Sequence, residues 1–222
     1  RFTAAAVPSY AVQAVTELSE PTQAIAGLAA PGKPPAPESP RTGNASPKGP
    51  AWGTLIHKML EYAMREEGEM TDTALTGLAS FLTADDPSLR GHLADAAAAV
   101  RSVMASEVWQ RARSSSECHT EVPFTIEVPT HELPGQPPDA PPRTILHGVI
   151  DLVYRVEGGW EIIDYKTDKD TEGLHKLPAE HRVQLGLYSR YWTAITGEAV
   201  ARAGLALVRA NQTVSLPYYR EH

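Results

Sequence analysis

The sequence predicts an α/β fold in which helices flank a mixed central β-sheet. Apolar residues recur at helical spacing from Trp52, alternate at strand spacing after Ser116, and return to helical spacing from Pro178. The expected order is therefore a group of helices, three strands, one helix and two further strands. This order is typical of α/β and α+β domains whose strands form one mixed sheet.

The composition allows one sizeable domain and excludes several classes of protein. Of the 222 residues, 42% are hydrophobic, which is enough to build a core. No run approaches the roughly 18–20 apolar residues that a membrane-spanning helix needs. The single cysteine, Cys118, excludes an internal disulfide and fits a cytoplasmic location. The net charge of −7 excludes a globally basic nucleic-acid binder, so any phosphate-binding surface must be local.

The chain is expected to have three parts. Residues 1–28 form an N-terminal segment with a short helix over 12–20, in which Thr16 is a candidate N-cap. Residues 29–51 are rich in Pro and Gly and are expected to be a linker. Residues 52–222 form the main domain. The chain begins with Arg1 and lacks the apolar core of a signal peptide, so we expect the natural protein to be longer on this side.

The main domain is expected to start with helices. Their first apolar stripe consists of Leu55, Ile56, Met59, Leu60 and Ala63. A second helix is expected over 72–82 and a long third one over 88–113, where Pro87 gives the start signal. The strands follow at 119–128, 145–156, 160–168, 199–210 and 213–219, with a Pro-rich loop over 129–143 and a helix over 178–195.

Gly158 and Gly159 predict a tight hairpin, because a two-residue loop favours positive φ at both positions. Counting back from this loop places Asp151 opposite Lys166. Asp164 then lies diagonal to Asp151 on the same face of the sheet. A slip of one residue would put the two carboxylates on opposite faces.

On the residues alone, this arrangement has two interpretations of roughly equal weight. The first is an exposed hairpin with a solvated charge pair. The second is a site for a hard divalent cation, Mg²⁺ with Mn²⁺ as a substitute, because carboxylate oxygens are its preferred protein ligands. Lys166 would then lie where it stabilises charge on a phosphoryl oxygen or assists a proton transfer.

Four short motifs around this hairpin occur in a specific order. They are GxxxH in GTLIHKMLE, GxxD in HGVIDLV, DYK in IIDYKTDK and QxxxY in VQLGLYSRYW. In this order the chain resembles the RecB/AddA-like C-terminal nuclease domain of bacterial helicase–nucleases, a branch of the PD-(D/E)xK superfamily. VTELSE at 15–20 also resembles the segment that precedes the nuclease in AddA-like chains. The likeness is absent from the Pro-rich loop.

The resemblance implies a restriction-endonuclease-like sheet and a set of site residues. These are the metal ligands His57, Asp151, Asp164 and the backbone carbonyl of Tyr165, the catalytic lysine Lys166, and the auxiliary pair Gln184 and Tyr188. Glu121 lies where such proteins often carry an acid on the first strand, and it is a weaker candidate. Some relatives carry four cysteines around an iron–sulfur cluster, which a chain with one cysteine cannot do.

Without the resemblance, several of these residues have simpler explanations. A histidine such as His57 on an apolar helix face is usually part of the core. Gln184 and Tyr188 form a spacing that is common on any packing helix. Weaker candidates are His119, His175 and His181 as phosphate contacts and His147 as a neighbour of the site. A basic group after the site is either a rim for DNA phosphates or a solvated helix face; it consists of Lys169, Lys176, Arg182 and Arg190.

The implied function is Mg²⁺-dependent hydrolysis of DNA phosphodiesters, as a single-strand exonuclease in a helicase–nuclease for double-strand-break repair and recombination. The implied partners are DNA, helicase motor domains in the same chain and a second helicase–nuclease subunit. No Walker motif GxxxxGK[ST] occurs, so any motor must lie elsewhere. The alternatives are a freestanding nuclease and a catalytically silent DNA-binding or scaffolding module of the same fold.

Overall fold

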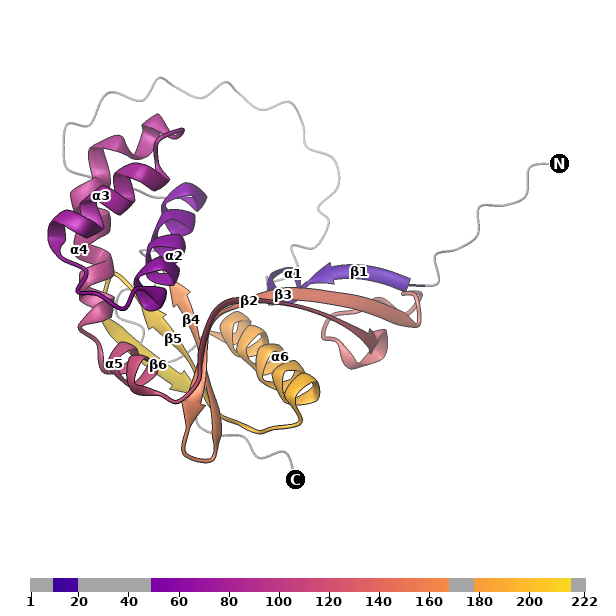
Figure 1. Ribbon diagram of the computed structural model, residues 1–222. Helices are drawn as coiled ribbons and strands as arrows, with labels where there is room; N and C mark the ends of the chain where they lie inside the picture. The colour runs from indigo at the N-terminus through magenta and orange to yellow at the C-terminus, as the bar shows by residue number, and fades with distance from the viewer. Residues whose placement is uncertain (1–9, 20–48, 168–177, 217–222) are drawn as a thin grey trace, which may run out of the picture.

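A computed structural model describes residues 10–19, 49–167 and 178–216, and its centre is a six-stranded mixed sheet (Figure 1). The strand order is β1-β3-β4-β5-β6, and β2 pairs with β3 beside this path. The strands are β1 (Tyr10–Ala14), β2 (Cys118–Pro129), β3 (Arg143–Val156), β4 (Gly159–Lys166), β5 (Val200–Leu207) and β6 (Gln212–Leu216). The predicted α/β class with a mixed sheet is confirmed.

Helices cover both faces of this sheet. α2 to α5 pack on one face, and α6 with the short α1 packs on the other (Figure 1). The helices are α1 (Val15–Ser19), α2 (Pro50–Arg65), α3 (Asp72–Leu82), α4 (Leu93–Met104), α5 (Glu107–Ser114) and α6 (Ala179–Thr196), with 3₁₀ turns at Pro87–His92 and Thr130–Glu132. The predicted apolar stripe of α2 is buried in the first of these two cores. None of the helices in the described ranges is both long and apolar enough to cross a membrane.

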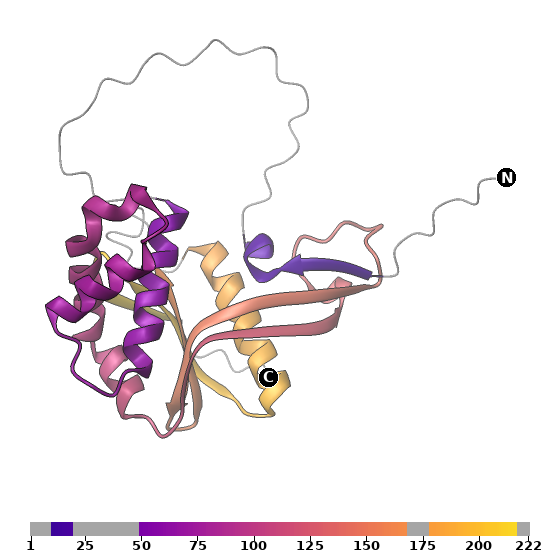
Figure 2. The same cartoon turned by 45° about the horizontal axis from the view of Figure 1, so that its top comes forward.

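β3 is long enough to join two parts of the sheet. Its residues 143–147 pair in parallel with β1, and its residues 152–156 pair antiparallel with β4. β2 runs antiparallel along most of β3. β1, the second half of β2 and the first half of β3 project from the rest of the sheet, and we call these three segments the arm (Figure 2).

The side chains of β3 change faces at one place, where the arm joins the rest of the sheet. Ile150 packs into the core beneath α6, whereas Leu152 packs into the core beneath α2. Strict alternation would put both side chains on one face. The pairs Thr120–Leu152 and Val122–Ile150 flank this point, so Glu121 of β2 lies level with Asp151. Glu121 has a φ of 49°. Positive φ is uncommon outside glycine, so a local backbone feature brings Glu121 and Asp151 to the same position.

The predicted hairpin loop was wrong. Val156 pairs with Gly159, so the loop consists of Glu157 and Gly158. Gly158 has a φ of 86°, as a tight turn requires. Gly159 belongs to β4, where a Cβ atom would lie 2.1 Å from the carbonyl oxygen of Ala199. Close packing against a neighbouring chain segment therefore explains the second glycine.

The corrected loop changes the partner of Asp151. Extending the ladder beyond the Leu152–Ile163 pair sets Asp151 opposite Asp164, where the sequence had predicted Lys166. The partner thus moves by two residues. Because side chains alternate with a period of two, this shift preserves the parity that places Asp151 and Asp164 on one face.

Two predicted helices also differ from the structure. The long helix expected over 88–113 is divided, because α4 ends at Met104 and Ser106 caps α5 by accepting a hydrogen bond from the Trp109 N–H group. The short helix expected over 12–20 begins only at Val15, since the preceding residues pair with β3 as β1. Thr16 therefore lies inside α1 and is not its N-cap. Most of the predicted linker lies outside the described residues.

Candidate metal and lysine site

Three side chains from three elements converge at the point where the side chains of β3 change faces. They are His57 from α2, Glu121 from β2 and Asp151 from β3. His57 Nδ1 lies 3.4 Å from Asp151 Oδ1 and 3.5 Å from Glu121 Oε1. One ligand atom from each residue lies within 4.8 Å of the others. We call this group the acid–histidine cluster.

The backbone and core hold the cluster in place. The Tyr165 N–H group donates a 2.7 Å hydrogen bond to Asp151 Oδ2, which leaves Oδ1 as the oxygen nearer His57. The Tyr165 ring packs in the core beneath α2 and meets the His57 ring edge-on, with centroids 5.9 Å apart. Asp151 is buried, and His57 and Glu121 are about a quarter exposed, at 26% and 28%.

Lys166 lies in a second group, formed with Asp164 and two residues of α6. Its Nζ atom is 2.8 Å from Asp164 Oδ2 and donates a hydrogen bond to Gln184 Oε1 at 3.1 Å. Gln184 Nε2 donates to Asp164 Oδ1 at 3.0 Å and to the Tyr188 hydroxyl oxygen at 3.2 Å. Gln184 is buried, so these contacts determine its orientation. We call these four residues the lysine network.

The electrostatics of the two groups differ. Burial alone would lower the pKa of His57, but hydrogen bonds and negative charge from Asp151 and Glu121 outweigh it and raise the pKa to about 10. The imidazolium therefore supplies the positive charge between the two carboxylates. Burial raises the pKa of Asp164, and the Asp151 charge adds to this effect while Lys166 opposes it.

The chemistry of the donors fits a divalent cation. Two carboxylates and an imidazole are common ligands of such ions, and a cation would replace the charge that the His57 proton supplies. Asp164 Oδ2 is buried and lies 2.8 Å from Lys166 Nζ, so the Lys166 ammonium already balances its charge. Asp164 is a further candidate ligand on the chemistry of its carboxylate alone.

The structure brings together most of the residues that the sequence singled out. His57 meets Asp151, Lys166 meets Asp164 and Gln184, and Gln184 in turn meets Tyr188. Asp164 belongs to the lysine network rather than to the acid–histidine cluster, so its role as a ligand stays a prediction. The same holds for the carbonyl of Tyr165.

Glu121 takes a larger place in the site than its sequence context indicated. The signal that could have found it is the register, since Glu121 lies between the residues that pair with Leu152 and Ile150 and is therefore level with Asp151. The sequence reasoning included Gly148 in the GxxD motif but gave it no role, and it missed Phe124 as a support of the site. The Phe124 ring meets the Tyr188 ring edge-on, with centroids 5.9 Å apart.

The weaker candidates lie elsewhere or in other contacts. His119 pairs with Glu117 at 3.0 Å, and His147 is exposed on the arm. Arg190 pairs with Glu132. His175, Lys169 and Lys176 lie outside the described residues, whereas Arg182 is exposed on α6 and His181 is partly buried there.

Comparisons with known proteins agree with the motif order. Residues 27–219 match the family model of the PD-(D/E)XK nuclease superfamily. An ATP-dependent helicase/nuclease subunit from Carboxydothermus hydrogenoformans is 32% identical over 113 residues, which cover 50% of this chain and 10% of that protein. The proteins of the same name from Acetivibrio thermocellus and Oceanobacillus iheyensis are 32% and 28% identical, over 47% and 54% of this chain and 9% and 10% of theirs.

The chain spans about a tenth of the length of these relatives. Among solved structures, the crystal structure of SSO0001 matches with a TM-score of 0.34 and 17% identity, over 74% of this chain and 75% of that one. The family match covers most of the sequence, including all four motifs. The chain therefore belongs to the PD-(D/E)XK nuclease superfamily.

Proposed function

We propose that this chain is a metal-dependent nuclease that hydrolyses DNA phosphodiester bonds, acting as a single-strand exonuclease within a helicase–nuclease. The observation that carries the proposal is the convergence of His57, Glu121 and Asp151 next to a buried lysine network. A carboxylate cluster beside a fixed lysine is suited to hold a divalent cation and to stabilise negative charge on a phosphate.

The residues would divide the work between them. His57, Glu121 and Asp151 would hold the cation, Mg²⁺ or Mn²⁺, with Asp164 as a further ligand. When bound, the cation would neutralise charge on the phosphate oxygens and make a water molecule more acidic. Lys166 would place its ammonium group against the reacting phosphate. Gln184 would hold Lys166 and Asp164 in their mutual orientation through the contacts described above.

The relatives suggest the setting of this activity. The matching proteins are named as ATP-dependent helicase/nuclease subunits, and this chain matches about a tenth of their length. We therefore propose that helicase motor domains in the same polypeptide deliver a DNA strand, and that the further partner is a second helicase–nuclease subunit. Double-strand-break repair and recombination, in the cytoplasm, is the process that such an assembly would serve.

The alternative is a DNA-binding module that no longer cuts. Loss of an acid or of the lysine would favour it, but this chain retains His57, Asp151, Asp164 and Lys166. Their side chains also make specific contacts rather than pointing into solvent, which favours the enzyme.

The test is degradation of end-labelled single-stranded DNA by the purified chain, with Mg²⁺, with Mn²⁺ and with EDTA. We expect cleavage with either metal, none with EDTA, and a loss of at least about 100-fold in Lys166→Ala. Lys58→Ala is the matched control, because it removes an exposed lysine from α2 and should leave cleavage unchanged. DNA that is bound but not cut by the wild-type chain in either metal would favour the silent module instead.

A further inference from the structure

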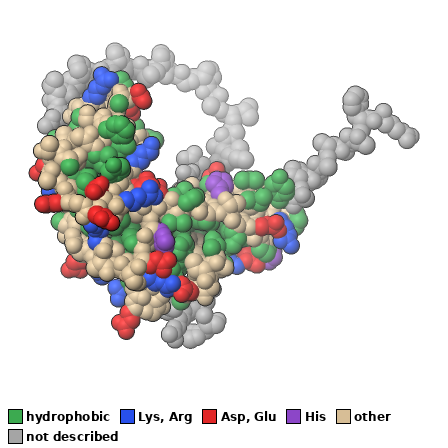
Figure 3. All heavy atoms as spheres, viewed as in Figure 1, with side chains coloured by type: hydrophobic (Ala, Val, Ile, Leu, Met, Phe, Trp, Pro, Cys, Tyr) green, Lys and Arg blue, Asp and Glu red, His purple; other side chains and the backbone are tan. Residues whose placement is uncertain are grey.

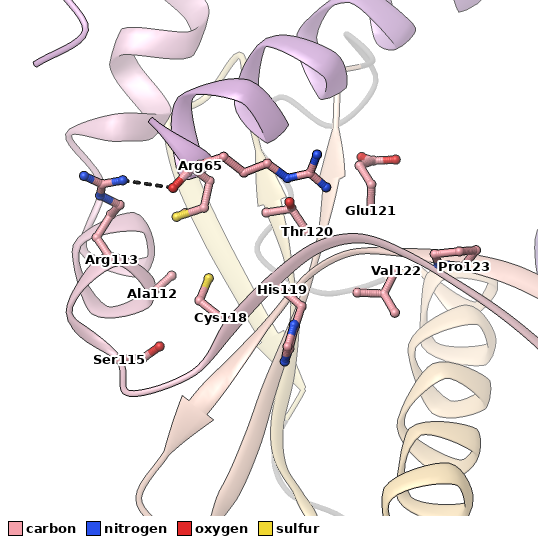
Figure 4. Close-up of a pocket in the computed structure, with 11 residues that line it drawn as sticks. Arg65, Ala112, Arg113, Ser115, Cys118, His119, Thr120, Glu121, Val122 and Pro123 are labelled. Atoms are coloured by element: carbon pink, nitrogen blue, oxygen red, sulfur yellow. Dashed lines mark hydrogen bonds between the residues drawn. The ribbon is translucent and has the colours of Figure 1, made fainter. Parts of the chain in front are cut away.

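An open pocket adjoins the acid–histidine cluster and has no part in the proposed chemistry. Its volume is about 470 Å³, which lies in the range of sites for small organic ligands (Figure 4). It lies between the end of α2, the end of α5 and the first half of β2. Its lining consists of Met64, Arg65, Ala112, Arg113, Ser115 and the β2 residues 118–123.

Glu121 connects this pocket to the cluster. Its side chain lines the pocket and also lies 3.5 Å from His57. Any molecule that fills the pocket would therefore lie directly beside the position of a phosphate at the cluster. For a chain polymer such as DNA, this is the place of a neighbouring nucleotide.

The two arginines of the lining have different roles. Arg113 Nη1 donates hydrogen bonds to the backbone oxygens of Met64 and Glu66, at 2.9 and 2.7 Å. It therefore caps the C-terminal end of α2. Arg65 is 66% exposed, and its side chain reaches from α2 toward Thr120 and Glu121 (Figure 4). Its ion pair with Glu61 joins this exposed side chain to a half-buried one within the same helix, and a pair of this kind contributes little to stability. Arg65 can therefore turn to an incoming anion.

The edge of β2 adds hydrogen-bond donors beside Arg65. The Arg155 N–H group donates to the Glu117 oxygen at 2.9 Å, so these two residues form a hydrogen-bonded pair. Along an antiparallel strand, residues whose N–H groups point toward the partner strand alternate with residues whose N–H groups point away from it. The N–H groups of Cys118 and Thr120 therefore point away from β3. No other described strand pairs with β2 on that side.

The inner part of the pocket is apolar. Met64 and Ala112 are buried in the core beneath α2, and Cys118 packs against it. The pocket thus combines an apolar floor, a cation near the cluster and outward backbone donors. This combination suits a base or sugar on the floor and a phosphate near the cation.

We propose that the pocket binds one nucleotide of the DNA strand next to the phosphodiester that is cut, with Arg65 contacting its phosphate. This inference rests on the proposed nuclease function. The chain as a whole carries a net charge of −7, and Figure 3 shows Lys and Arg side chains interspersed with acidic ones on this face. A single well-placed arginine would therefore account for a measurable share of the attraction to DNA.

The test measures binding of a fluorescent oligo(dT) to the full chain in EDTA, where no cleavage occurs, over a series of salt concentrations. Arg65→Ala should raise the Kd about 3- to 10-fold and reduce the slope of log K against log salt by about 0.7, the value for one phosphate contact on a single strand. Arg90→Ala is the matched control, because Arg90 is exposed outside the pocket, and it should change neither quantity. An unchanged Kd and slope in Arg65→Ala would overturn the proposal.

A second variant separates DNA contact from a structural role of Arg65. Glu61→Ala removes the ion pair but keeps the guanidinium, so binding should be equal or tighter. Binding that weakens as much as in Arg65→Ala would assign the effect to the ion pair and contradict the proposal. In cleavage assays Arg65→Ala should raise KM and leave kcat near the wild-type value. If the wild-type chain cuts DNA and Arg65→Ala has the same KM, the nucleotide-binding role of the pocket is refuted and the nuclease function stands. If the wild-type chain does not cut DNA, the nuclease function itself is refuted.

Discussion

Gly148 and Phe124 lie so close together that a Cβ atom at position 148 would be 2.8 Å from Phe124 Cε1. The same atom would be 3.2 Å from Tyr188 Cε1. The glycine of the GxxD motif therefore makes room for two rings that meet edge-on. The hydroxyl oxygen of one of them, Tyr188, accepts a hydrogen bond from Gln184. Packing on the arm is thereby connected to the lysine network.

Gly148→Ala should displace the Phe124 ring and, through it, Tyr188 and Gln184. We expect the free energy of unfolding to fall by about 1–3 kcal/mol, as for other overpacked cores. We also expect kcat for DNA cleavage to fall about 10-fold with little change in KM, because Lys166 loses its support. Adding Phe124→Leu should restore part of both losses in urea unfolding and in kinetics. A double variant no better than Gly148→Ala would contradict this explanation.

Gln184 and Tyr188 should differ in their importance. Gln184→Ala removes contacts to both Lys166 and Asp164, so kcat should fall about 100-fold, or roughly 2.7 kcal/mol of barrier. Tyr188→Phe removes only the hydroxyl that accepts from Gln184, so the loss should stay within about 10-fold. Steady-state kinetics of the two variants measures both effects. Equal losses would show that the Tyr188 hydroxyl acts on the reaction independently of Gln184.

Cys118 should react slowly with alkylating reagents at moderately alkaline pH. Burial raises the pKa of its thiol to about 11, and the nearby Arg113 charge only partly opposes this. Because the raised pKa favours the neutral thiol, the reactive thiolate should form in quantity only as the pH approaches 11. At pH 8.5 iodoacetamide should react with the folded chain roughly 100-fold more slowly than with the chain unfolded in urea. As the only cysteine, Cys118 gives an unambiguous signal, and a folded-state rate that levels off near pH 8.5 would contradict its burial.

The two glycines of the β3–β4 hairpin should have unequal costs of substitution. Gly158→Ala meets no neighbour and strains only a φ of 86°, so it should cost about 1 kcal/mol of stability. Gly159→Ala would press a Cβ atom to within 2.1 Å of the Ala199 carbonyl oxygen and should cost at least about 3 kcal/mol. Urea unfolding of both variants measures the difference. Equal losses of stability in the two variants would support the predicted hairpin, in which Gly158 and Gly159 are the two loop residues.

Patterning along the chain predicted the α/β class, α2, α3 and α6, and the strands β2 to β6, because apolar periodicity reports directly which face is buried. Register was harder to predict. The contact that requires Gly159 comes from Ala199, which is 40 positions away along the chain and carries no local signal. The strand β1 was mistaken for helix because its partner, β3, lies more than 120 residues further on.

The site shows the same division between local and distant information. His57, Asp151, Lys166 and Gln184 could be found because they belong to motifs within short segments. Glu121 could be found only weakly, because its place depends on the β2–β3 register and on a positive φ that no local sequence pattern announces. Phe124 was missed because its contact with Tyr188 joins the arm to α6.

The most direct test of the central claim is isothermal titration of Mn²⁺ into the metal-free chain and into two isosteric variants, Asp151→Asn and Glu121→Gln. Loss of a carboxylate ligand should abolish measurable binding in the first variant and weaken it at least about 10-fold in the second, with both variants still folded by circular dichroism. That result would establish the acid–histidine cluster as the metal site. Undiminished Mn²⁺ affinity in Asp151→Asn would contradict it and would separate any nuclease activity from the cluster described above.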